Sequence, residues 1–443
     1  MNVPSAVLLV SFFLAAQLGA GSAALAVETP TSPAASIIWG ERAQGKTYRI
    51  ADDVTSDGLN RTYVLETPEG SFTIEGDALM ALRLKEYAIY EQLSEDSGFS
   101  QFMGSFGSSV IAPLKFGGQL IISPVETAKQ SAEGIGNFFD SMSASSENKD
   151  AERGSFMGSV LGTDRARREL AAQAQIDPYT DFPPLARRLQ ELAAARGVGG
   201  LSVSGAMMAI PGGAALPSLT ASTTRTVAFS ASSVGAAQGL QDALRTKTAG
   251  QILRDCRLRL AALAPDTDAV EALVDNKNYT PADLLVIATA LERVGARDTA
   301  LFVAQASAAE DRATAYLNRQ QAEMYAGLRR SFPFDHFAAK DGFVLLELKD
   351  QRHLLALPAD QLFWTSKNQQ DFTALGSGSA PDKRPPSAPA KKDKILVITG
   401  EYSKMARSEL AKLNWEPARM TLTAGLAHDP KPAAPQKPVK QAH

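Results

Sequence analysis

The sequence predicts an α+β protein: a mainly α-helical body between a small N-terminal unit, made of a β-hairpin and a helix, and a C-terminal α/β unit with a β-α-β crossover. Three patterns predict this class: apolar and polar residues alternate between positions 48 and 75, capped helical patterns recur through 100–330, and a continuous apolar run precedes a capped helix after position 394. The predicted divisions are a signal peptide (1–26), the N-terminal unit (36–97), the helical body (100–330), the C-terminal unit (340–425, with a disordered insert at 376–394) and a disordered tail (427–443).

The composition is typical of a soluble globular protein. The chain has 443 residues, 44% of them hydrophobic, and its 45 basic and 48 acidic side chains give a net charge of -3. These values exclude a collagen, a disordered polyelectrolyte and a polytopic membrane protein. Because Lys and Arg are not in excess, nucleic acid is not expected as a partner.

The N-terminus has the pattern of a secretory leader. No charged side chain precedes Glu28, Ala6–Ala16 is an eleven-residue apolar core, and Ala24-Leu25-Ala26 fits the A-x-A cleavage rule. The segment before the core lacks Lys and Arg, so an uncleaved membrane anchor is the alternative, although the core is well short of the ~20 residues that span a bilayer. We expect cleavage near Val27 and export to the periplasm or the cell exterior, with membrane association left open.

The region after the leader predicts a hairpin with a partner strand, followed by a helix. Apolar residues alternate with polar ones around Tyr48–Ile50, Tyr63–Leu65 and Phe72–Ile74, and Pro68-Glu69-Gly70 supplies a turn. Asp77 is placed to cap a helix over 78–93. One short sheet with one helix on it would bury the apolar face of each.

Caps and apolar spacing predict the helices of the middle region. The expected helices are 123–139 after a capping box at Ser123–Glu126, 163–174 capped by Thr163, 183–197 capped by Asp181, 281–294 between Thr280 with Asp283 and Gly295, and one or two more within 298–330. A further helix at 251–263 places Cys256 on its apolar stripe. As the sole cysteine it excludes an intramolecular disulfide and is expected in the core, with a reactive thiolate as the alternative.

The most unusual stretch of the body is 197–224, which carries no charged side chain. Pro211-Gly212-Gly213 interrupts it, and a helical arm such as Val198–Ile210 would be about 20 Å long, short of the ~30 Å hydrocarbon layer of a membrane. Two interpretations remain: small residues that let buried helices approach closely, which is the favoured one, or a hairpin that docks into a membrane or a partner.

The last third predicts a small α/β unit, because its apolar pattern changes again. The expected elements are strands at Phe343–Leu348 and His353–Leu357, a helix at Asp360–Asp371, the proline-rich insert 376–394, a buried strand at Ile395–Ile398, a helix capped by Ser403, and a short strand after Asn414-Trp415. The final strand, helix and strand would form the β-α-β crossover.

Several segments together resemble a known family. The segments TYVLETPEGSFTIEG, SPVETAKQSAEGIGNFF, LGTDRARRELAAQAQIDPYTDFPPL, LPADQLFWT and TGEYSKMARSELAKLNW are similar to those of an uncharacterised family of exported, mostly proteobacterial proteins. The resemblance covers most of the mature chain. It implies export and one coherent protein with a helical centre and an α/β C-terminal unit, and it carries over no functional residue.

Common catalytic and metal-binding motifs do not occur in the sequence. Neither C-x-x-C nor H-E-x-x-H is present, and there is no G-x-S-x-G elbow or Walker loop. We therefore expect no metal and no cofactor. The weak catalytic candidates are Asp335 and His336, where a carboxylate beside an imidazole among aromatic residues could serve as a general acid or base. The alternative is an aromatic plug that joins the helical body to the C-terminal unit.

Two other groups are weak binding candidates. Asp177, Tyr179 and Asp181 could coordinate a hard cation, or could serve only as helix ends and caps. Thr399, Gly400 and Ser403 follow a buried strand, where β-α-β units often bind ligands.

The sequence favours a binding or assembly function. A large, well-specified fold without a converging set of polar residues is typical of an exported cell-envelope protein that binds another component. The first alternative is a periplasmic hydrolase with a site between the helical body and the C-terminal unit. The second is a peripheral membrane protein that acts through 197–224. An envelope protein or a membrane surface is the expected partner, and the oligomeric state is left open.

Overall fold

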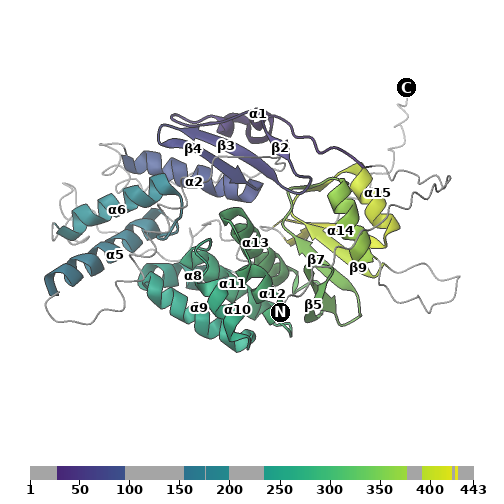
Figure 1. Ribbon diagram of the computed structural model, residues 1–443. Helices are drawn as coiled ribbons and strands as arrows, with labels where there is room; N and C mark the ends of the chain where they lie inside the picture. Colours follow the sequence, from purple (N-terminus) through teal and green to yellow (C-terminus); the bar gives the residue numbers. More distant parts are fainter. Residues whose placement is uncertain are drawn as a thin grey trace, which may run out of the picture.

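The computed structural model describes residues 27–94, 154–174, 176–198, 234–376, 392–421 and 425–427. Within them it confirms the predicted α+β class, with N-terminal strands, a helical body and a C-terminal sheet (Figure 1). Other predictions fall outside the described residues: the leader 1–26, the helix 123–139, all but the start of the stretch 197–224, most of the insert 376–394, and the tail after Ala427. Among the described helices, none has both the length and the apolar character needed to cross a bilayer.

A four-stranded antiparallel sheet forms the centre of the N-terminal unit. Its elements are the helix α1 (Ala35–Trp39), the short 3-10 helix η1 (Gly40–Ala43), the strands β1 (Arg49–Ile50), β2 (Thr55–Ser56), β3 (Arg61–Thr67) and β4 (Gly70–Glu75), and the helix α2 (Asp77–Ser94). The long strand β3 pairs with all three other strands. The predicted hairpin and the helix after it are thus confirmed, and the hairpin closes at Gly70, whose φ of 136° favours glycine.

The helices α5 (Gly154–Ala174) and α6 (Pro183–Val198) pack against this sheet and α2. One buried cluster contains apolar side chains from the sheet, from α2 and from both of these helices: Tyr63, Leu65, Tyr87, Leu170, Leu185 and Leu189. In Figure 1 this helix pair lies at the opposite end of the N-terminal unit from the C-terminal sheet. The N-terminal unit therefore bridges two regions that are distant in sequence.

Two predicted caps in this region are wrong. Thr163 lies inside α5, which begins at Gly154. A threonine within a helix costs only roughly 0.5–0.7 kcal/mol relative to alanine, so a helix can continue through it. The helix α6 begins at Pro183, so the residue directly before it is Phe182. Asp181 therefore lies one residue too early to be its N-cap. The Asp181 carboxylate instead accepts hydrogen bonds from two arginines of other helices.

The helical body is built around the helix α11 (Pro281–Val294), most of whose residues are buried. The other described elements of the body are α8 (Val234–Thr246), α9 (Ala249–Leu263), α10 (Thr267–Val274), α12 (Ala300–Ser307) and α13 (Arg312–Leu328). The helix α11 has the predicted capping box between Thr280 and Asp283 and ends at Gly295, which adopts the left-handed conformation. Cys256 is buried, as predicted, and burial raises the pKa of its thiol to about 12.

A six-stranded mixed sheet forms the C-terminal unit, in the order β12-β11-β9-β7-β6-β5. Its strands are β5 (Phe334–Lys340), β6 (Phe343–Leu348), β7 (His353–Leu357), β9 (Lys394–Ile398), β11 (Trp415–Thr421) and β12 (Gly425–Ala427). The strands β5, β6 and β7 form an antiparallel meander, whereas β7, β9 and β11 run parallel. The helix α15 (Lys404–Lys412), capped by Ser403 as predicted, connects β9 to β11 and confirms the β-α-β crossover.

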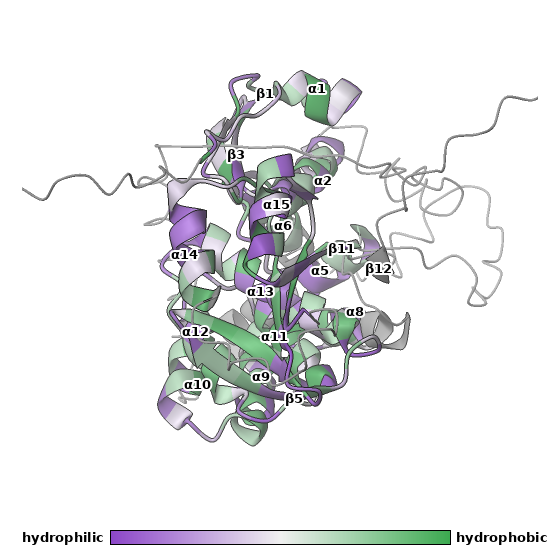
Figure 2. Ribbon diagram, turned by 90° about the vertical axis from the view of Figure 1, so that its right-hand side faces the viewer, coloured by the Kyte–Doolittle hydropathy of each residue, from purple (hydrophilic) through white to green (hydrophobic). Residues whose placement is uncertain are grey.

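Helices cover both faces of this sheet. Leu346, Leu354 and Val397 point into the core of the helical body, whereas their strand neighbours Leu345 and Leu355 face α15 and the helix α14 (Ser366–Gly376). The alternation follows from the two-residue repeat of a strand. Figure 2 shows hydrophobic strands between the helices and hydrophilic residues on the outer helices α14 and α15.

Three details of the C-terminal unit differ from the prediction. The helix predicted at Asp360–Asp371 begins only at Ser366, because 361–362 form the short strand β8 (Gln361–Leu362), which pairs with β10 (Glu401–Tyr402). The predicted insert 376–394 extends too far, since Lys394 is the buried first residue of β9. The strand β5 was not predicted, because its two aromatic residues do not follow a strict alternation.

The segments that lead into β8 and β10 approach each other closely at Gly400, which has no side chain. A Cβ atom at Gly400 would lie 1.6 Å from the carbonyl oxygen of Asp360, so that no side chain fits there. We expect Gly400→Ala to lower the free energy of unfolding by about 3 kcal/mol or more in urea titrations. Gly250→Ala in α9 is the matched control, because no atom lies within 4 Å of its Cβ position. An equal effect of both substitutions would contradict this account.

Candidate functional site

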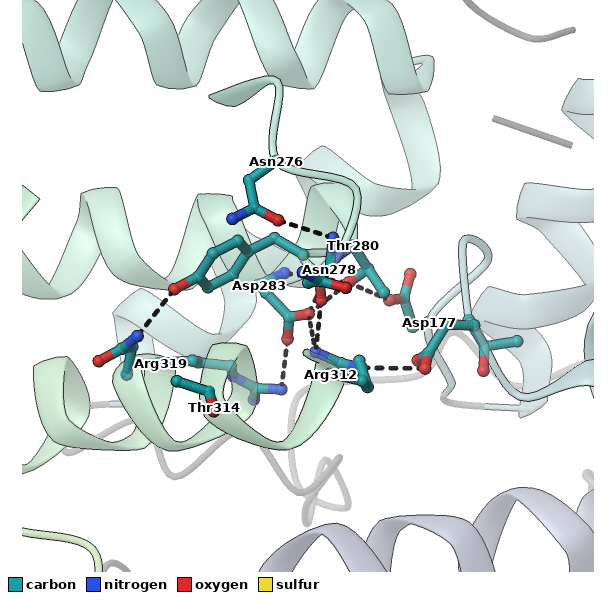
Figure 3. Close-up of polar contacts among 12 residues, drawn as sticks. Asp177, Asn276, Asn278, Thr280, Asp283, Arg312, Thr314 and Arg319 are labelled. Atoms are coloured by element: carbon teal, nitrogen blue, oxygen red, sulfur yellow. Dashed lines mark hydrogen bonds and ion pairs between the residues drawn. The ribbon is translucent and has the colours of Figure 1, made fainter. Parts of the chain in front are cut away.

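The described residues contain an alternating row of acids and arginines, which we call the charge chain. Figure 3 shows its central part, around Asp283, Arg312 and Arg319. The whole row runs through Glu86, Arg83, Asp181, Arg312, Asp283, Arg319 and Glu323. These residues come from α2, the segment before α6, α11 and α13. The charge chain therefore joins the N-terminal unit to the helical body.

Arg83 forms the N-terminal end of this network. Its guanidinium lies 2.6 Å from a carboxylate oxygen of Glu86 on the same helix and 2.5 Å from Asp181. The side chain packs over the ring of Phe182, with 5.3 Å between the guanidinium carbon and the ring centroid. The hydroxyl of Thr180 donates a further hydrogen bond to Glu86. Each charge at this end is therefore shielded from water and bound by an opposite charge.

Arg312 is the central link. Its guanidinium lies 2.9 Å from Asp181 and 2.8 Å from Asp283, so one cation bridges two carboxylates from different segments. Arg319, on the same face of α13, adds a contact of 3.1 Å to Asp283. Both arginines pack against the ring of Tyr316 between them. The spacing of 312, 316, 319 and 323 follows the helical repeat, which brings this set to one side of α13.

Asp283 serves two purposes at once. Its side chain accepts a 2.9 Å hydrogen bond from the backbone N–H of Thr280, which completes the cap of α11, and it also binds both arginines of α13. The side chain is only 1% exposed. The capping geometry therefore fixes the carboxylate at the point where the two guanidinium groups meet it.

The environment shifts two aspartates of this region in opposite directions. Burial would raise the pKa of Asp181, but the positive charges of Arg312 and Arg83 outweigh it and lower that pKa to about 2. Burial raises the pKa of Asp177 to about 7, although its carboxylate accepts hydrogen bonds from Tyr179 N–H at 2.8 Å and from the Thr280 hydroxyl at 3.0 Å. Two arginines compensate the charge of Asp181, whereas these hydrogen bonds to Asp177 come from neutral donors.

The chain's own groups bind the three candidate cation ligands. Asp181 is a member of the charge chain and binds two arginines, and Asp177 accepts a hydrogen bond from Thr280. The Tyr179 hydroxyl donates a 3.0 Å hydrogen bond to the carbonyl of Lys247. In the part of the chain that the structure describes, no three His, Cys, Asp or Glu side chains form a group that could hold a metal ion.

The candidate pair Asp335 and His336 lies on β5, where that strand meets the helical body. Asp335 Oδ2 is 3.1 Å from His336 Nδ1 and 2.7 Å from a guanidinium nitrogen of Arg297. The hydrogen bond from His336 and the nearby Arg297 lower the pKa of Asp335. Across the sheet, Glu347 Oε2 lies 3.8 Å from the Nε2 atoms of both His336 and His353. The expected contact between Asp335 and the His336 imidazole is present, and the same carboxylate also binds Arg297.

The neighbouring aromatic residues bind β5 to the body. Phe334 and Phe337 are buried in the core that the helical body shares with the sheet. The backbone N–H of Arg297 donates to the carbonyl of Asp335, and the N–H of Phe337 donates back to the carbonyl of Arg297. This arrangement has the features of the aromatic plug that the sequence offered as the alternative.

The third candidate group, at the carboxyl end of β9, is covered by the chain itself. The Thr399 hydroxyl and the Gly400 N–H both donate to the carbonyl of Ala359. Ser403 caps α15 and binds the carboxylate of Glu28, which also accepts a hydrogen bond from the backbone N–H of Trp364. The segment 359–364 and Glu28 thus occupy the position where a ligand would approach such a crossover.

Sequence reasoning missed the arginines of the charge chain. Arg83 lies among the apolar positions of α2, and Arg312 and Arg319 recur at helical spacing on α13. Such a stripe is more often a solvated helix face, so spacing alone does not reveal burial. Comparisons with protein-family models, curated proteins and solved structures find no match to this chain.

Replacing Arg312 should destabilise the protein, because it removes the positive charge that compensates Asp181 and Asp283. We expect Arg312→Met to lower the free energy of unfolding by about 3–5 kcal/mol, because Asp181 and Asp283 each lose a partner in a buried setting. Arg257→Met is the matched control: its pairs with Glu271 and Asp275 are largely exposed, and the expected loss is about 0–1 kcal/mol. Urea titrations measure both values. Similar losses for the two variants would refute a structural role for the charge chain.

The raised pKa of Asp177 predicts a pH effect on stability. A carboxyl whose pKa is raised on folding contributes stability that is present in full below its unfolded pKa and is lost as pH rises through its folded pKa, here about 7. We expect Asp177→Asn to flatten the decline in unfolding free energy between about pH 4 and pH 7, as measured by urea titrations at several pH values. An unchanged pH profile in this variant would show that Asp177 is ionised throughout that range.

Proposed function

We propose that this chain is an exported cell-envelope protein that binds or assembles with another envelope component and does not turn over a substrate. The leader pattern at 1–26 supports export. Glu28, the second residue of the expected mature chain, hydrogen-bonds through its N–H to the carbonyl of Trp364 at 3.0 Å, and its carboxylate binds Ser403. The residues that directly follow the expected cleavage site are thus part of the fold.

One observation carries the binding assignment: the candidate polar groups are bound by partners from the chain itself. Asp181 is held by two arginines, Asp335 by Arg297, and Ser403 by its cap and Glu28. Cys256 is buried, and its raised thiol pKa disfavours a thiolate. These charges join segments that are distant in sequence, which suits a rigid body that presents a surface to a partner.

The assignment can be tested with the mature chain, starting at Val27, as bait in the native cell. We expect capture from envelope fractions to yield a component that also binds the purified chain directly, with equal affinity for wild type and His336→Ala. We expect equal affinity because the charged contacts that the structure describes for His336 are with Asp335 and Glu347 of its own chain. Isothermal titration with the purified component measures both affinities.

Three results would contradict the assignment. The first is an activity in a hydrolase substrate screen that His336→Ala abolishes while circular dichroism shows an intact fold, since that would favour the hydrolase. The second is flotation of the mature chain with lipid vesicles, which would favour the membrane-contacting alternative. The third is a full-length chain with its leader intact in the cytosolic fraction.

A further inference from the structure

A second buried polar cluster lies where the N-terminal unit meets the C-terminal unit. Arg61 of β3, Asp77 at the start of α2 and Asp360 just before β8 are 0%, 5% and 7% exposed. An Arg61 guanidinium nitrogen is 3.4 Å from Asp77 Oδ2, and another donates a 2.8 Å hydrogen bond to the side chain of Gln361. The Tyr63 hydroxyl donates to Asp77 Oδ1 at 2.9 Å.

Asp360 joins the two units through both side chain and backbone. Its carboxyl oxygens accept hydrogen bonds from the backbone N–H groups of Asp77 at 3.2 Å and Arg61 at 3.3 Å. The N–H groups of Asp360 and Gln361 both donate to the carbonyl of Leu59. These contacts connect segments separated by almost three hundred residues, and two of the four involve the carboxyl group of Asp360.

The charges of this cluster do not balance if both carboxyls are ionised. The buried guanidinium of Arg61 lies 3.4 Å from Asp77, and the buried carboxyl of Asp360 accepts hydrogen bonds from the backbone N–H groups of both Arg61 and Asp77. Two carboxyls that are removed from water beside one cation repel each other least when one of them holds a proton. The other acid that acts on Arg61 is Glu401 of β10, which has its own partner in Arg419 at 2.6 Å. No second cation among these groups can therefore replace the proton.

We propose that a proton shared by Asp77 and Asp360 is a pH-sensitive fastening between the N-terminal and C-terminal units, closed while the proton is held and loosened when it is lost. Loss of the proton leaves two buried carboxylates at the interface with a single guanidinium, that of Arg61, beside them. Like charges in a site without water repel strongly, so the contacts made by Asp360 weaken.

The pKa directions agree with this geometry. Burial is the main cause that raises the pKa of Asp77 to about 6 and that of Asp360 well above its ordinary value. Burial likewise lowers the pKa of Arg61 to about 10, so the arginine stays charged at neutral pH. Because both carboxyl pKa values are raised on folding, the stabilisation is present in full below the unfolded value of 3.8 and is lost as pH rises through the folded values.

Hydrogen exchange of the full chain tests the fastening directly. The reporters are the backbone N–H groups of Asp360, Gln361 and Phe363, which donate to carbonyls of residues 58 and 59. After correction for intrinsic exchange, we expect their opening constant to rise more than about tenfold between about pH 5 and pH 8, because each proton released changes an equilibrium by up to tenfold per pH unit. N–H groups of α11 serve as the internal control for global unfolding and should change less.

Asp360→Asn should remove the pH response of the reporters, because an amide has no proton to lose in this range. The NH2 group of the amide cannot accept one of the two backbone hydrogen bonds, so this variant should also be less stable than the wild type at every pH. Asp77→Asn should likewise remove the pH response and covers the case in which the first variant does not fold. Asp177→Asn is the matched control: that carboxyl also has a raised pKa but contacts Thr280 in the helical body, so the reporters should keep their wild-type response. A flat wild-type profile, or an unchanged response in a folded Asp360→Asn or Asp77→Asn variant, would overturn the proposal.

Discussion

The fold depends on one electrostatic constraint: charges removed from water must be paired within the protein. Arg312 meets this constraint for two carboxylates at once, Asp181 ahead of α6 and Asp283 in the cap of α11. An isolated carboxylate in that position would cost several kcal/mol, so the two segments cannot separate without exposing or abandoning a charge. The charge chain thereby makes the relative position of the N-terminal unit and the helical body a condition for folding.

The same constraint recurs at the two other contacts between regions. Asp360 joins the C-terminal unit to β3 and α2 through hydrogen bonds to Arg61 and Asp77. Arg297, which follows α11 in the helical body, binds Asp335 on β5. The three contacts differ in burial: the cluster around Asp360 is buried, the Arg312 contacts are mostly buried, and the pair of Arg297 and Asp335 is largely exposed. Apolar packing supplies most of the stability, as in other proteins, whereas these polar contacts determine which surfaces meet.

Local signals in the sequence were sufficient for much of the fold. The capping box at Thr280, the stop at Gly295, the cap at Ser403 and the apolar run 395–398 each depend on neighbouring residues, and the structure contains all of them. The failures have a common cause. Asp181 was predicted to cap a helix and Asp360 to begin one, but their partners lie 98 to 299 residues away, and no local pattern encodes such a pairing.

We infer that buried polar contacts unite the regions into one cooperative body. Trp39 belongs to the N-terminal core, and the other two tryptophans, Trp364 and Trp415, lie in the C-terminal unit. In a Trp364→Phe, Trp415→Phe variant, urea unfolding followed by Trp39 fluorescence and by far-ultraviolet circular dichroism measures the N-terminal unit and the helical body in the same molecule. At about pH 5, where the carboxyl fastening is closed, the account predicts coincident transitions; a Trp39 transition at clearly lower urea than the helical one would contradict it.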